Sequence, residues 1–101
     1  MPRSYRERLP RDTVRDLLAI ARALYRAERD AGASPERLAK LAEIGKWYRD
    51  ALDLSGRTER DTMGHRAAWM WAERATRALG ELIAEDVRLA PAFDATARVL
   101  R

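Results

Sequence analysis

Residues 65–72 read His-Arg-Ala-Ala-Trp-Met-Trp-Ala and lie inside residues 58–90, the longest helical pattern of the chain. At about 3.6 residues per turn, the charged side chains of this segment fall on one side of a helix. The opposite side is apolar over about half of the circumference, wider than the ~100° stripe that one core requires. The pattern predicts either the central helix of a small bundle or a helix with a second, intermolecular surface. The apolar side consists of Ala67, Ala68, Trp71, Ala75, Ala78, Leu79, Leu82 and Ile83.

The tryptophans of this segment also indicate a contact surface. Trp69 and Trp71 point about 160° apart on a helix, so the two rings cannot share one face. At least one ring should therefore lie at the margin of the core or in an interface, where tryptophan often contributes much of the binding energy. Across the preceding turn, Trp47 should approach Met70 and Trp71, and such an aromatic–methionine cluster is most simply core packing.

The composition indicates one folded domain. The chain has 101 residues, of which 47% are hydrophobic and 36% charged, and this balance excludes disorder as the default. Helical periodicity recurs along the chain and no strand pattern is visible. We therefore predict an all-α fold, a small three-helix bundle with a long third helix and a short C-terminal helix. Residues 1–11 form a basic N-terminal arm, and residues 12–101 form a single helical domain.

The first two helices should form a hairpin. The first helix should begin at Asp12 or Thr13 and end before Gly32, which suits the left-handed position after a helix. The second helix has the clearest start signal, with Ser34 as N-cap and Pro35 in the first helical position. Because the connection between the two helices is short, they should pack antiparallel.

Two positions within this hairpin predict specific contacts. Gly45 falls opposite Ala21, and two small residues favour a close approach of the helices, so that Gly45→Leu should overpack the hairpin. Glu28 lies close to the middle of an apolar face, where a carboxylate requires a partner. Arg37, across the hairpin turn, and Arg49 are the candidate partners.

The third helix should begin at Thr58, with Asp61 and Thr62 as alternative N-caps, and end before Pro91. Residues 92–100 could form a short fourth helix. At about 1.5 Å per residue, the third helix would span roughly 45 Å, against roughly 30 Å for each helix of the hairpin. Its C-terminal part would then extend beyond the hairpin.

The exposed apolar end of this helix predicts a protein interface. It must be covered by the C-terminal segment, by the N-terminal arm or by another copy of the chain. We expect a homo-oligomer, because an apolar surface of this kind favours association. The predicted protein interface consists of Trp69, Met70, Leu82, Ile83 and Val87.

Arginines suggest an alternative function. The formal net charge is +4, and the excess of positive charge lies in the first third of the chain. Arg15, Arg22, Arg26 and Arg29 fall on one flank of the first helix beside Tyr25, which could stack on a base. This row and the basic arm could contact the phosphates of a nucleic acid or of a (cyclic) nucleotide. The competing interpretation is a solvated face with intrahelical ion pairs, such as Asp30 with Arg26.

Signs of catalytic chemistry are few. His65 and Asp61, four residues apart, could supply two metal ligands, but a zinc site needs at least one more, and the chain has no other histidine and no cysteine. The sequence contains neither a nucleophile elbow nor a glycine-rich phosphate loop. We therefore predict no catalytic residue, no metal and no cofactor, and place a small hydrolase or metal enzyme third among the possible functions.

The sequence favours a non-enzymatic protein-interaction or assembly module that self-associates through its tryptophan-rich third helix. Binding of nucleic acid or nucleotide is the alternative. The N-terminal residues have no secretory signal, and no apolar run is long enough to span a membrane, so we expect a cytoplasmic protein with no membrane association.

Overall fold

The computed structural model describes residues 8–57, 62–84 and 86–100. Within these residues every regular element is helical, which confirms the predicted all-α fold, and no helix is both long and apolar enough to cross a lipid bilayer. The elements are α1 (Arg11–Asp30), α2 (Pro35–Arg57), α3 (Thr62–Ile83), α4 (Ala90–Ala97) and the 3-10 turn η1 (Arg98–Leu100).

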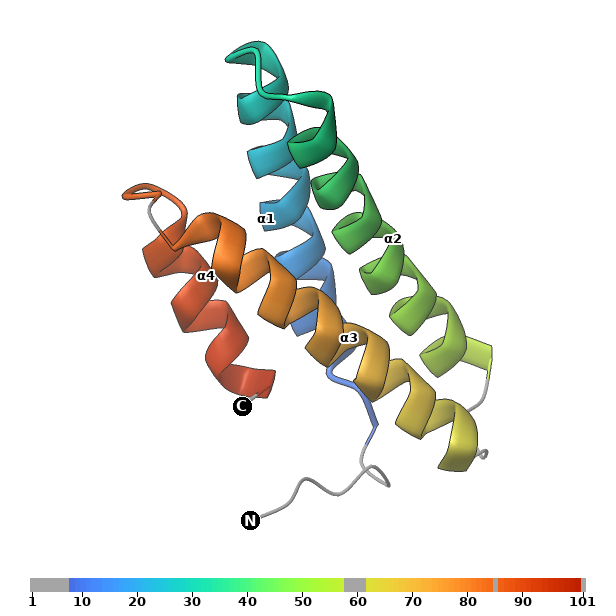
Figure 1. The fold of residues 1–101 in the computed structure, drawn as a ribbon. Coiled ribbons are helices and arrows are strands. Elements are labelled where there is room, and N and C mark those ends of the chain that lie inside the picture. The colour runs from blue at the N-terminus through green and yellow to red at the C-terminus, as the bar shows by residue number, and fades with distance from the viewer. Residues whose placement is uncertain (1–7, 58–61, 85, 101) are drawn as a thin grey trace.

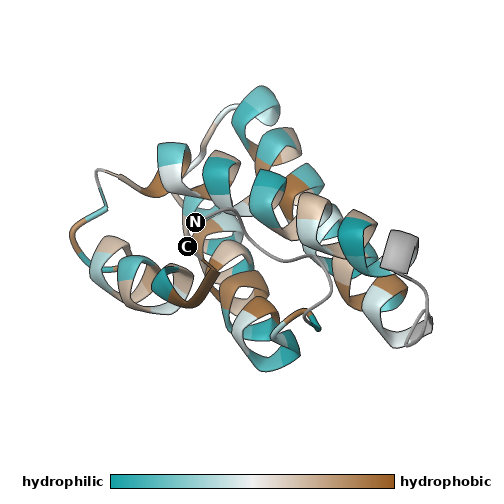
Figure 2. Cartoon of the chain, turned by 90° about the horizontal axis from the view of Figure 1, so that it is seen from below, coloured by the Kyte–Doolittle hydropathy of each residue, from teal (hydrophilic) through white to brown (hydrophobic). Residues whose placement is uncertain are grey.

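The α1–α2 hairpin forms one side of the molecule, and α3 packs against it (Figure 1). The helix α3 crosses in front of α1 and lies along the lower part of α2, while α4 turns back beside α3 and also reaches α1. Every helix carries both hydrophobic and hydrophilic segments, as expected of helices with one buried face (Figure 2).

The turn between α1 and α2 follows the sequence prediction. Gly32 has a φ of +80°, a conformation that glycine adopts without steric cost, and the Ala33 amide donates to the Glu28 carbonyl at 2.9 Å. The Ser34 hydroxyl accepts a hydrogen bond from the Arg37 amide at 3.3 Å, as its predicted role of N-cap requires. Glu28 pairs with the side chain of Arg37, the first of the two partners that the sequence suggested.

The helix α3 is shorter than the sequence pattern indicated. It ends at Ile83 instead of continuing to residue 90, and its 22 residues are no more than the 23 of α2. Its described part begins at Thr62, one of the alternative N-caps, whereas Thr58 and Asp61 lie outside the described residues. The Asp86 carboxylate explains the early end, because it accepts hydrogen bonds from the Arg88 and Leu89 amides, both at 2.8 Å. These two bonds lower the pKa of Asp86 and favour a turn over further helix.

The turn at Asp86 brings α4 back over the apolar end of α3. Phe93 of α4 is buried against Gly80, where an added Cβ would lie 3.3 Å from the Phe93 ring. Ile83 is therefore only 1% exposed. Of the three covers that the sequence left open for this end of α3, the C-terminal segment lies there among the described residues.

A polar pair is buried between α2 and α3. The Thr76 hydroxyl donates to the Ala72 carbonyl at 2.7 Å, so its single hydrogen is used, and Tyr48 must donate to Thr76 over their 2.9 Å contact. Burial raises the pKa of Tyr48 above its ordinary value, so the phenol stays neutral. This pair fixes the register of the two helices.

We predict that Thr76→Val lowers the free energy of unfolding by about 1–3 kcal/mol, although the two side chains have nearly the same shape. The valine leaves the buried Tyr48 hydroxyl without its acceptor, and an unsatisfied buried donor has a cost of this size. Urea unfolding followed by circular dichroism measures the change. In Tyr48→Phe, which lacks the hydroxyl, the further change Thr76→Val should cost much less, and an equal cost would contradict this assignment.

Candidate functional site

The outer side of α3 is exposed along its whole described length and faces away from the hairpin (Figure 1). We call this surface the α3 outer face. Met70 is the one large apolar residue among those described on this face, and it is 56% exposed. The α3 outer face consists of Arg66, Met70, Glu73, Arg74, Arg77, Glu81 and Ala84, of which Glu73 is half-buried and the others are exposed.

Two half-buried tryptophans lie where this face meets α2. The ring centroids of Trp47 and Trp71 are 6.3 Å apart, which confirms the predicted approach of these residues. The Arg74 guanidinium lies over Trp47, 4.4 Å from the ring centroid, and 5.7 Å from that of Trp71. Such cation–π contacts contribute roughly 0.5–1 kcal/mol at exposed sites, so Arg74 is held at the edge of the face. An open hollow of about 580 Å³ lies beside these residues and is lined by Ala67, Met70, Trp71, Glu73, Arg74 and Arg77.

The predicted interface residues do not form one surface. Trp69 is 2% and Ile83 1% exposed, so the prediction that these two side chains form an interface is wrong. Leu82 is half-buried and packs against the core. Val87 is 88% exposed but belongs to the turn after α3, which leaves Met70 alone on the α3 outer face.

The four arginines of the predicted row fall into two groups, those with and those without an ion-pair partner among the described residues. Arg15 forms an ion pair with Asp12 at 3.1 Å, and Arg29 pairs with Asp30 at 3.4 Å. The intrahelical pair that the sequence suggested thus forms with Arg29 instead of Arg26. Among the described residues, neither Arg22 nor Arg26 has an ion-pair partner.

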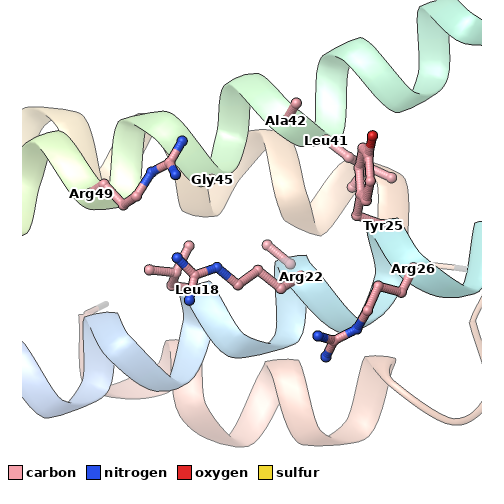
Figure 3. Close-up of a pocket in the computed structure, with 9 residues that line it drawn as sticks. Leu18, Arg22, Tyr25, Arg26, Leu41, Ala42, Gly45 and Arg49 are labelled. Carbon is pink, nitrogen blue, oxygen red and sulfur yellow. The ribbon is translucent and has the colours of Figure 1, made fainter. Parts of the chain in front are cut away.

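Arg22 and Arg26 line a pocket of about 230 Å³ between α1 and α2, together with Arg49 of α2. Tyr25, the predicted stacking residue, forms a wall of this α1–α2 pocket. In Figure 3, Arg22 and Arg49 extend from opposite helices to the same end of the pocket, whereas Arg26 points away from α2. The apolar part of the lining consists of Leu18, Ala21, Leu41, Ala42 and Gly45.

Gly45 lies at this pocket, and its surroundings differ from the predicted close packing. A Cβ at Gly45 would meet a single side-chain atom, Cδ1 of Leu18, at 3.8 Å, which is ordinary van der Waals contact. The expected crowding of Gly45 against Ala21 is therefore absent, because both residues line the pocket. From the sequence, Arg49 was predicted only as a possible partner of Glu28, and no pattern along the chain places it beside Arg22.

His65 lies at the opposite end of α3 from α4. It is buried and lines a small hollow with Arg8, Arg11 and Ser55, so it is not exposed on the helix surface. Arg11 is held there by hydrogen bonds to the Leu52 carbonyl and the Ser55 hydroxyl. The other predicted ligand, Asp61, and the arm residues 1–7 lie outside the described residues.

Within the described ranges, no three histidine, cysteine or acidic side chains come together as metal ligands could. Comparison of the chain with models of protein families, with curated proteins and with solved structures gave no match. The α3 outer face and the α1–α2 pocket are therefore the two surfaces on which a function can be argued.

Proposed function

We propose that the chain is a non-enzymatic assembly module that forms an antiparallel homodimer through the α3 outer face. The observation that carries the proposal is the order of charges on this face around Met70. Arg66 and Glu73 have opposite charges and are spaced by two helical turns, so they lie on the same flank of α3.

Two identical helices that pack antiparallel about a twofold axis bring the same flank of each helix together. Arg66 of one copy then faces Glu73 of the other, and the symmetry repeats this pair. The midpoint between Arg66 and Glu73 falls beside Met70. The axis thus passes close to the one large apolar side chain of the face, and the two methionines contact each other there.

The residues on the other flank of the α3 outer face are consistent with the same twofold axis. Ala67 and Arg74 are also two turns apart, with Met70 close to their midpoint. In the antiparallel dimer the small Ala67 of one copy faces Arg74 of the other and leaves room for its guanidinium. Arg74, held over Trp47, then lies at the edge of the interface.

A parallel dimer fits this face less well. Its axis runs along the helices, so each residue near the middle of the face meets its own copy. Arg77 would lie opposite the same arginine of the second copy, and like charges that face each other are destabilising. The antiparallel arrangement separates the two Arg77 side chains along the helix axis.

The expected affinity is modest. Exposed ion pairs contribute about 0.2–1 kcal/mol each, so the charges mainly determine orientation and register. Met70, Ala67 and the aliphatic stems of the arginines supply the apolar area. A dissociation constant on the order of micromolar is consistent with such an interface.

Two charge reversals and their mixture test this function. Arg66→Glu places two glutamates opposite each other, and Glu73→Arg places two arginines opposite each other. Each variant alone should dissociate about tenfold more readily, which corresponds to about 1.4 kcal/mol. Mixed in equal amounts, the two variants should form a heterodimer as stable as the wild type, because both contacts are again between opposite charges. Analytical ultracentrifugation measures all three samples.

Glu43→Arg, the same reversal on an exposed position of α2, is the matched control and should leave association unchanged. Arg66 and Glu73 also take part in interactions within their own chain, so the melting temperature of each variant is measured in parallel. A wild-type chain that stays monomeric at hundreds of micromolar, or a mixture that associates no better than its components, would contradict the proposal.

Disulfide formation distinguishes the two orientations, since the chain has no cysteine of its own. A mixture of Arg66→Cys and Glu73→Cys should form mixed disulfide dimers faster than either variant forms dimers alone. A parallel dimer should not favour the mixed disulfide, because positions 66 and 73 of the two copies then lie about two helical turns apart along the axis.

The alternative function, binding of a nucleic acid, has less support. Two of the four arginines in the row are already paired with aspartates of α1. Steep weakening of binding with salt is the mark of multiple phosphate contacts. The remaining arginines, Arg22 and Arg26, line a small pocket between α1 and α2 and do not form an extended row.

A further inference from the structure

We propose that the α1–α2 pocket binds a small aromatic anion, with Arg22 and Arg49 contacting its carboxylate or phosphate group. This proposal is independent of the dimer, because the pocket is built from α1 and α2 and contains no residue of the α3 outer face. The charge of the pocket, its apolar lining and its size all favour such a ligand.

The charge of the pocket is of one sign. Its lining includes Arg22, Arg26 and Arg49 and no acidic side chain. Among the described residues these guanidinium groups have no ion-pair partner, in contrast to Arg15 and Arg29 on the same helix. Guanidinium groups are weakly hydrated and form paired hydrogen bonds to carboxylates and phosphates, so an anion with planar or tetrahedral oxygens fits this end of the pocket.

The rest of the pocket is apolar and suits a ring. Leu18, Leu41 and the bare backbone of Gly45 form its floor, and the Tyr25 ring forms a wall (Figure 3). Aromatic rings pack favourably beside such a wall in offset or edge-to-face arrangements. An inorganic anion would leave this surface in contact with water, whereas a neutral ring would leave the guanidinium groups unused.

The size of the pocket limits the ligand. Its volume of about 230 Å³ is below the roughly 300–1,000 Å³ of sites that enclose drug-sized molecules. The pocket has room for a single substituted ring but not for a dinucleotide. Arg22 and Arg49 also converge on one end instead of following a line, which suits one anionic group better than a chain of phosphates.

Benzoate and phenyl phosphate are the probes, and the neutral benzyl alcohol and inorganic phosphate are their controls. Titrations are followed by the amide signals of the isotope-labelled chain of 101 residues in nuclear magnetic resonance spectra. At least one of the two aromatic anions should bind saturably, at least tenfold more tightly than either control. The stronger of the two shows whether the pocket prefers a carboxylate or a phosphate ester.

Arg49→Gln and Arg22→Gln should each weaken binding of that anion about tenfold or more. Arg15→Gln is the matched control, because Arg15 lies on α1 but is paired with Asp12 outside the pocket, and it should bind as the wild type does. Gly45→Leu should block the pocket while the circular dichroism spectrum and the melting temperature show an intact fold. The glutamine variants are exposed surface changes that keep the same fold, so loss of binding in them is informative by itself.

Three results would overturn the proposal. The first is a control that binds as tightly as the aromatic anions, and the second is an equal loss of binding in Arg15→Gln. The third is a single-stranded oligonucleotide that binds far more tightly than either probe and weakens steeply with salt, since this behaviour identifies a site for a polyanion.

Discussion

Replacing Trp69 by alanine is expected to lower the free energy of unfolding by about 3–5 kcal/mol, the range for a buried large aromatic residue. Trp69 is only 2% exposed, and its core cluster also contains Leu9, Phe93 and Leu100. The core that contains Trp69 thus also includes a residue before α1 and residues of the C-terminal segment. Chemical denaturation with circular dichroism measures the loss, and a cost below about 1 kcal/mol would show that Trp69 is not part of the core.

The neighbouring residue gives the matched control. Met70 is 56% exposed on the α3 outer face, so Met70→Ala should change stability by less than about 0.5 kcal/mol. On the proposed dimer, however, Met70→Ala removes the apolar contact at the axis and should weaken association. Adjacent residues of one helix thus separate folding from assembly. An equal loss of stability in both variants would contradict the observed register of α3.

The sequence contained enough information for the hairpin and for the charged side of α3. Gly32, Ser34 and Pro35 determine the turn through their backbone preferences, which act locally and can be recognised without a structure. The pairing of Glu28 with Arg37 was also accessible, because the two residues flank that short turn. The contact between Trp47 and Trp71 could be predicted because the two residues lie at similar distances along the chain from the turn between α2 and α3.

The end of α3 could not be predicted because two local signals compete there. The apolar period continues through Leu82 to Val87, but the Asp86 carboxylate accepts hydrogen bonds from the Arg88 and Leu89 amides and stops the helix. Propensity and periodicity do not indicate which of these signals is stronger. This error placed Ile83 and Val87 on one exposed surface, although one is buried and the other lies in a turn.

The α1–α2 pocket depended on packing that no single segment reveals. Arg22 and Arg26 were already candidates as members of the predicted row. They differ from Arg15 and Arg29, whose side chains form ion pairs with aspartates of α1, and this difference depends on side-chain rotamers. Arg49 joins them only because α2 packs beside α1 in this register. The helical periodicity gives the face of a residue and not its neighbour on the next helix.

Phe93→Ala is expected to be as destabilising as Trp69→Ala, with a loss of about 3–5 kcal/mol. Phe93 is the largest buried side chain of α4, and it packs closely against Gly80 of α3, where an added Cβ would lie 3.3 Å from its ring. Since α4 has only 8 residues, it is too short to be stable without this contact, and the loss of the ring should release it from α3. Hydrogen exchange should then increase throughout α4 while the amides of the α1–α2 hairpin remain protected.

Release of α4 would also expose Ile83 and the apolar end of α3 that the sequence assigned to an interface. We therefore expect Phe93→Ala to associate more strongly than the wild type, in a manner that Glu73→Arg does not reverse. Val99→Ala, a truncation at a position that is 57% exposed in η1, is the matched control and should change neither stability nor association. If Phe93→Ala remains as stable as Val99→Ala, α4 does not cover α3 in solution, and the apolar end of α3 returns as a candidate interface.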